Sequence, residues 1–103
     1  MEINTWFNLT RSQQIGNIGS EISRAARWEE QEDIKNRNLA IERSLLLIEL
    51  TLDDPKWKRN LKEIARMHEV MCSKLISPSF FEITLKELEN FCVEFVLQNI
   101  SVR

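Results

Sequence analysis

The sequence predicts a single all-α domain over residues 1–103, folded as an antiparallel up-down four-helix bundle. Three observations favour this class. Only two glycines and two prolines are present, so few residues interrupt helices. No stretch alternates apolar and polar residues for long enough to predict a strand. The hydrophobic content of 43% supplies the core that one domain of this length needs.

The first helix is predicted to begin after Thr10. Thr10 and Gln13 have the spacing of a capping box, in which the hydroxyl accepts from a backbone amide and the glutamine side chain reaches back to the cap. Apolar residues then recur at helical spacing, and they are Ile15, Ile18, Ile22, Ala25 and Ala26. This stripe predicts the buried face of the helix.

Small residues lie beside that stripe, at Ser12, Gly16, Gly19 and Ser23. A glycine inside a helix costs about 1 kcal/mol relative to alanine, so we expect a contact that offsets it. Close packing of a second helix against Gly16, Gly19 and Ser23 is the prediction. A ligand that uses this groove is the alternative.

The acidic run from Glu29 to Asp33 predicts a turn, with Asp33 as the cap of a second helix. One continuous helix from Thr10 to Leu52 is the alternative. The second helix has a predicted core stripe of Ile34, Ile41, Leu45, Ile48 and Leu52.

A second apolar stripe on the same helix consists of Leu39, Leu46 and Leu50. These leucines exceed what one small bundle needs to bury. They predict an interface between copies of the chain, most simply a two-fold dimer.

Asp53-Asp54-Pro55 predicts the start of a third helix, since proline is favoured at a first helical position and aspartate before it. Its predicted buried residues are Trp57, Leu61, Ile64, His68, Met71, Cys72 and Leu75. Ser77-Pro78-Ser79 should end it. Thr84 and Glu87 form a second capping box for a last helix that buries Leu85, Leu88, Phe91, Cys92, Phe95 and Val96. Phe80, Phe81 and Ile83 are expected to cover one end of the core.

Four cations form a basic face on the third helix, because Lys58, Arg59, Lys62 and Arg66 fall within about 100° on a helical wheel. They are the candidate contacts for nucleic acid. An ordinary solvated face is the alternative, since Glu63 and Glu69 lie at pairing distance along the helix. The net charge of −2 argues against a strongly basic nucleic-acid-binding or membrane-surface protein.

No residue set predicts catalysis, a metal or a cofactor. His68 is the only histidine, and no Glu-x-x-His pair is present. Folding the third helix back on the fourth should place His68 opposite Cys92, but no orienting group for such a thiol-imidazole pair is evident. A histidine within the core is the alternative.

Targeting signals are absent from the N-terminal residues, and the longest apolar run falls far short of the ~20 residues that a membrane span needs. The two cysteines lack the C-x-x-C spacing. These features predict a cytoplasmic protein with free thiols and no membrane association.

Three segments carry a resemblance: WFNLT-x-x-QQIGNIGSEISRA from Trp6, AIERSLLLIELTLDDPKW from Ala40, and KEIAR from Lys62. The chain resembles a group of small uncharacterised prokaryotic all-α proteins, from which no activity carries over. Its outline is also similar to HEPN-type helical domains, some of which are ribonucleases in toxin pairs. Their arginine and histidine lie a few residues apart, whereas Arg66 and Arg59 precede His68 by two and nine residues.

The sequence therefore predicts a non-catalytic helical interaction module that self-associates or acts as a partner subunit. The alternative is a nucleic-acid-associated accessory protein, of the kind found in toxin-antitoxin-like pairs, which would use the basic face.

Overall fold

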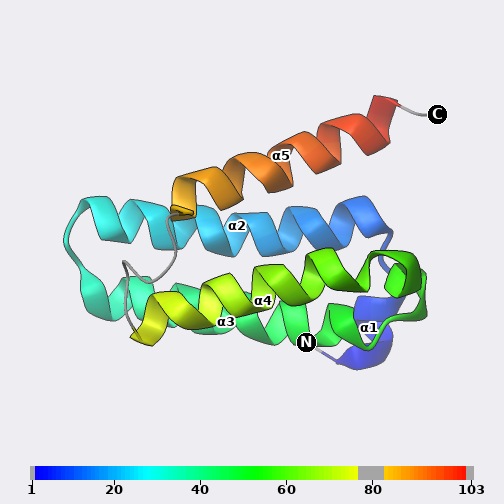
Figure 1. Cartoon of the computed structure of the whole chain (residues 1–103), viewed down its shortest axis with the longest axis horizontal. Coiled ribbons are helices and arrows are strands. Elements are labelled where there is room, and N and C mark those ends of the chain that lie inside the picture. The colour runs from blue at the N-terminus through cyan, green and yellow to red at the C-terminus, as the bar shows by residue number, and fades with distance from the viewer. Residues whose placement is uncertain (1, 77–82, 102–103) are drawn as a thin grey trace.

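The computed structural model describes residues 2–76 and 83–101, and the regular secondary structure in these two stretches is entirely helical (Figure 1). The elements are α1 (Ile3–Phe7), α2 (Arg11–Glu30), α3 (Ile34–Leu52), the 3-10 helix η1 (Pro55–Asn60), α4 (Leu61–Ile76) and α5 (Leu85–Ser101). The all-α prediction is thus confirmed.

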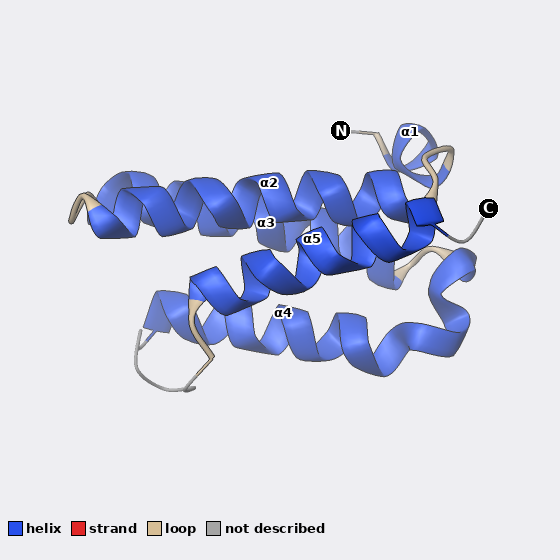
Figure 2. Cartoon of the chain, turned by 90° about the horizontal axis from the view of Figure 1, so that it is seen from above, coloured by secondary structure: helices blue, strands red, loops and turns tan. Residues whose placement is uncertain are grey.

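The helices pack around α2, which contacts α3 on one side and α5 on another, while α3 also contacts α4. The pair α4 and α5 is not among the closely packed pairs. Figures 1 and 2 show α5 lying along α2 and tilting away from the other helices toward its C-terminal end. The side of α4 that faces α5 is therefore only partly covered.

The predicted turn after the first long helix is confirmed. Glu32 adopts a left-handed conformation with φ of 58°, and the Asp33 carboxylate accepts from the backbone amide of Asn36 at 3.1 Å. A residue in this conformation interrupts the helical hydrogen bonds. The alternative of one continuous helix from Thr10 to Leu52 is therefore wrong.

Thr10, Asp54 and Thr84 also cap helices as predicted, whereas the short helix α1, which was not predicted, has no side-chain cap. Gln13 and Thr10 exchange both hydrogen bonds of a capping box. Asp54 caps η1 by accepting from the backbone amide of Lys56 at 3.0 Å, with Pro55 in the first turn. The Thr84 hydroxyl accepts from the backbone amide of Glu87.

A buried polar network, which the sequence analysis did not anticipate, joins the N-terminal end of the chain to η1. Gln14 is fully buried and donates to the backbone carbonyl of Trp6 and to Asp54, each at 2.8 Å. Its carbonyl oxygen accepts from Trp57 Nε1 at 2.7 Å. Trp6 Nε1 donates to Thr51 Oγ1 at 3.0 Å. Because every partner is buried, the network fixes α1 and η1 on the same end of α2.

Three residues predicted for the core are instead exposed: Ile34, Leu61 and Phe91. Ile34 and Leu61 begin their helices, and the buried face of α4 is centred on Ile64 and Met67. Trp57 does not share the phase of α4, since it lies in a 3-10 helix with three residues per turn.

The predicted helix end at Ser77-Pro78-Ser79 and the core residues Phe80 and Phe81 lie outside the described residues. Ile83 is partly buried and packs against the core.

Candidate functional site

α2 and α5 approach each other closely at Gly19. A Cβ built on Gly19 would lie 2.8 Å from Cys92 Cβ, whereas one built on Gly16 would lie 3.9 Å from Val96 Cγ2. A hydrogen bond from Ser23 lowers the pKa of Glu89 on α5. Three members of the small-residue stripe therefore face α5, and a hollow of about 400 Å³ lies beside them.

The leucines assigned to an oligomer interface lie along α3, and two of them are open to solvent. Leu46 is 63% exposed and Leu39 is 42% exposed, while Leu50 is partly buried. With Arg43 they recur at spacings of four, three and four residues, so they form one outward stripe. Arg43 is neutralised within the protomer by Glu21 of α2, at 3.0 Å.

A hollow of about 630 Å³ separates the outward side of α3 from α2 and includes Leu46, Leu47 and Leu50 in its lining. Apolar side chains in an open hollow are exposed to water, and a bound partner would bury them. This α3 leucine face, defined by Leu39, Leu46 and Leu50, is one candidate interaction surface.

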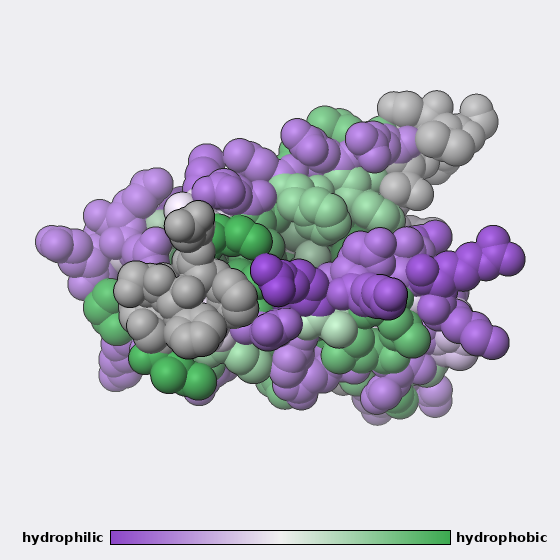
Figure 3. Space-filling view, in the orientation of Figure 1, coloured by the Kyte–Doolittle hydropathy of each residue, from purple (hydrophilic) through white to green (hydrophobic). Residues whose placement is uncertain are grey.

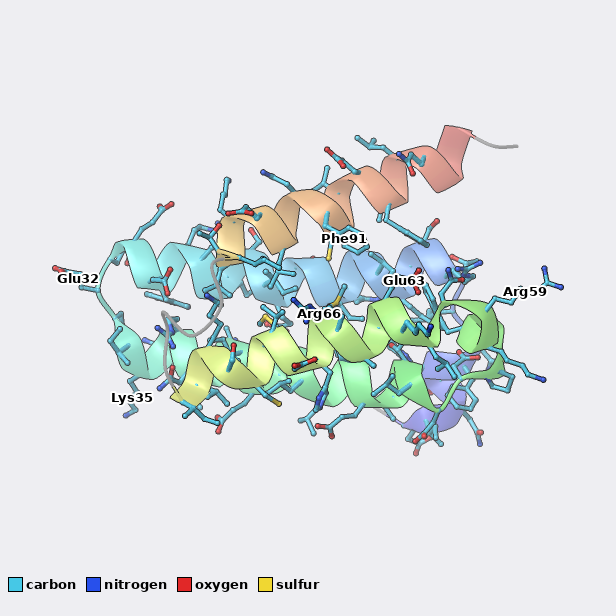
Figure 4. All side chains as sticks on the ribbon, in the orientation of Figure 1. Glu32, Lys35, Arg59, Glu63, Arg66 and Phe91 are labelled. Carbon is cyan, nitrogen blue, oxygen red and sulfur yellow. The ribbon has the colours of Figure 1, made fainter. Side chains whose placement is uncertain are left out.

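The cations of the predicted basic face spread along η1 and α4. The side chains of Lys58, Arg59 and Lys62 are exposed and make no hydrogen bond or ion pair with another described residue. Arg66 lies 4.0 Å from Glu69. Figure 4 shows Arg59 extending from the η1 end of the molecule, whereas Arg66 lies partway along α4, below Phe91.

Between α4 and α5 the partly covered side of α4 forms a groove of about 360 Å³. The lining residues from α4 are Lys62, Glu63, Arg66, Met67 and Val70. Those from the α5 side are Ile83, Leu88 and Phe91. Figure 3 shows apolar side chains exposed between the polar surfaces of the two helices.

Sequence reasoning missed this α4–α5 groove because it treated Phe91 as a core residue and left Met67 and Val70 unassigned. The spacing of Ile64, Met67 and Val70 was the available signal, since residues three apart share a helix face. Phe91 is 44% exposed, which reflects the tilt of α5 away from α4.

His68 does not lie opposite Cys92 as predicted, since it contacts other groups. Its Nε2 is 3.0 Å from Glu49 Oε2, and its Nδ1 is 3.7 Å from Cys72 Sγ. Cys92 packs against Gly19 instead. Cys72, His68 and Glu49 thus follow the order of thiol, imidazole and carboxylate that is found in thiol catalysts.

The surroundings of Cys72 and of Cys92 both disfavour the thiolate. Burial and the negative charge of Glu49 raise the pKa of the Cys72 thiol, and burial followed by the charge of Glu89 raises the pKa of Cys92 to about 12. The thiolate is the reactive form, so both cysteines are poor nucleophiles at neutral pH.

Within residues 2–76 and 83–101, no three His, Cys, Asp or Glu side chains are grouped so as to hold a metal ion. None of the described helices is both long enough and apolar enough to cross a membrane. No protein-family model, curated protein sequence or solved structure matches the chain.

Proposed function

We propose that this protein is a non-catalytic helical interaction module that self-associates as a two-fold dimer through the α3 leucine face. In the proposed architecture α2 to α5 form an antiparallel up-down four-helix bundle with one open side. The observation that carries the proposal is the outward stripe of leucines, of which Leu46 is 63% exposed. Leu39 and Leu46 are exposed, whereas Leu50 is partly buried and packs against the core.

The spacing of the stripe suits a second copy of the same helix. Leucines that recur every three or four residues form a seam in which two helices interlock side chains. Arg43 interrupts that seam and is paired with Glu21. A polar residue in a seam fixes the register of the two helices at some cost in stability, so a single dimer arrangement is expected.

The test is light scattering at tens of micromolar with wild-type protein and Leu46→Glu. The wild type should have twice the mass of the 12.2 kDa chain, and the variant should be monomeric with an unchanged circular dichroism spectrum. Leu61→Glu is the matched control, because Leu61 is also exposed but lies on α4. A monomeric wild type, or a dimeric Leu46→Glu, contradicts the proposal.

A cytoplasmic location is part of the proposal. It is supported by the free thiols of Cys72 and Cys92, which persist in a reducing compartment.

The second candidate is a nucleic-acid-associated accessory protein, as in a toxin-antitoxin-like pair. It is favoured by Lys58, Arg59 and Lys62, whose charges have no partner among the described residues. The groove beside Lys62 weakens this candidate, because its lining is mainly apolar and phosphate contacts need charge or hydrogen-bond donors.

A further inference from the structure

We infer that the α4–α5 groove docks an amphipathic helix of a partner protein, with acidic residues along the flank beside α4 and basic residues along the flank beside α5. This site is distinct from the α3 leucine face and goes beyond self-association. An apolar helix face lying in a groove between two helices is a recurrent mode of protein recognition.

The floor of the groove is apolar and already formed. Met67, Val70 and Leu88 are at most 8% exposed, and Phe91 at the α5 edge is 44% exposed. Phe91 is the most exposed aromatic side chain that lines the groove, so this ring is the expected anchor for a partner. Met67 adds an adaptable wall, since methionine side chains adjust to differently shaped partners.

The two edges of the groove differ in charge, since cations lie on the α4 side, where Arg66 is 4.0 Å from Glu69, and carboxylates lie on the α5 side. Lys62 and Arg66 line the α4 side with one carboxylate, that of Glu63. On α5, Glu87 and Glu94 lie four residues before and three residues after Phe91, so both flank that ring on the helix surface. A partner helix needs the complementary arrangement, acidic beside Lys62 and basic beside Glu94.

This charge pattern selects a helix over other occupants. Nucleic acid would place phosphates near the carboxylates of Glu87 and Glu94, which repel them. A small ligand is held by polar groups that converge inside a pocket, whereas here the charged residues border an apolar floor. The α4 lining spans Lys62 to Val70, about 12 Å of helix, which matches two turns of a partner.

The test uses defined peptides of 14 residues with leucine at positions 1, 4, 8 and 11. The first peptide has glutamate on one flank of the leucine stripe and lysine on the other. The second has the same composition with both charges mixed on each flank, and the third has lysine on both flanks. Binding is measured by fluorescence anisotropy and by the methyl resonance of Met67, with fully buried Met71 as the internal reference.

Wild-type protein should bind the first peptide about fivefold or more tightly than the second, because rim ion pairs contribute modestly but add together. Lys62→Glu with Arg66→Glu makes both edges acidic and should transfer the preference to the third peptide. Phe91→Ala should weaken every complex by about tenfold. Val93→Ala is the matched control, because Val93 is 51% exposed on the same helix but does not line the groove.

The inference would be overturned if the first two peptides bind equally, or if the Met67 resonance does not shift at millimolar peptide. It would also be overturned if Phe91→Ala binds the peptides as tightly as the wild type. Saturable binding of dodecanoate at Met67 where the first peptide has no effect would overturn it as well. The Leu46→Glu variant keeps the two ideas separate, since peptide binding should survive in it whether or not the wild type is a dimer.

Discussion

The backbone of Gly19 in α2 lies against the side chain of Cys92 in α5, so close that an added Cβ would be 2.8 Å from Cys92 Cβ. Two real carbon atoms at this separation would overlap, and the Cys92 Cβ cannot move without its own backbone. The contact draws α5 onto α2. α5 packs closely against α2 but not against α4, and the α4–α5 groove lies open on that side.

Alanine substitutions at the two glycines of α2 should therefore have opposite effects. Gly19→Ala gains helix propensity but forces α5 away, and we expect a net loss of about 1–3 kcal/mol in unfolding free energy. Gly16→Ala should gain up to about 1 kcal/mol, because its Cβ meets Val96 at an ordinary 3.9 Å. Urea denaturation of both variants gives the comparison. A stabilised Gly19→Ala would show that the helices separate easily here.

The starts of α2, α3, η1 and α5 were predictable because each has a local chemical cause. Thr10, Asp33, Asp54 and Thr84 accept backbone hydrogen bonds at the caps, and a cap depends on residues within one turn. Helix phase was predictable only within one type of helix. Because η1 is a 3-10 helix, the buried face of α4 is rotated from the one predicted by continuing an α-helix from Trp57. Met67 was therefore not predicted to lie on that face.

The groove and the buried polar network could not be predicted for a different reason. Gln14 is hydrogen-bonded to Asp54 and Trp57, which are 40 and 43 residues away along the chain. Gln14 lies four residues before Ile18, on the buried face of α2, but nothing in the local sequence indicates which distant groups it would bind. Likewise, the exposure of Phe91 depends on how α5 is oriented relative to α4, which the local sequence of α5 does not specify.

Asp54 should make the protein sensitive to acid. Burial alone would raise its pKa, but hydrogen bonds from Lys56 and Gln14 outweigh burial and lower the pKa. A carboxylate with a lowered folded-state pKa stabilises the fold above its unfolded pKa of about 3.9, and this contribution is lost as the pH falls further. We expect Asp54→Asn to lose about 1–3 kcal/mol of unfolding free energy at pH 7. Below about pH 4 the stability of this variant should fall less steeply with pH than that of the wild type.

The measurement is the urea midpoint at pH 7 and pH 3. Asp53→Asn is the matched control, because Asp53 is the exposed neighbour of Asp54. This substitution should leave the loss of stability between pH 7 and pH 3 almost unchanged. If wild type and Asp54→Asn lose the same stability between pH 7 and pH 3, Asp54 is not the source of the acid sensitivity.

The two thiols should react at very different rates in the native protein. Cys92 is buried with a pKa raised to about 12, so its thiolate population at pH 7 is lower than that of a free cysteine by roughly a thousandfold. Cys72 is partly exposed and should be alkylated first by iodoacetamide, though more slowly than free cysteine because its pKa is also raised. Mass spectrometry follows both sites. If Cys72 is alkylated faster than free cysteine at pH 7, His68 activates the thiol. That result would favour a catalytic function for Cys72.

The last prediction concerns nucleic acid and the basic residues of η1 and α4. Arg59 and Arg66 lie well apart along the molecule (Figure 4), and Arg66 is close to Glu69, so few phosphates could be contacted together. With a net charge of −2, we expect binding to single-stranded or duplex oligonucleotides no tighter than about 10 μM at physiological salt. A mobility-shift titration at several salt concentrations measures this, with Lys62→Glu compared to Lys35→Glu at the other end of the molecule. Sub-micromolar binding that weakens with salt and is abolished by Lys62→Glu alone would instead identify phosphate contacts on this face and favour the nucleic-acid function over the interaction module.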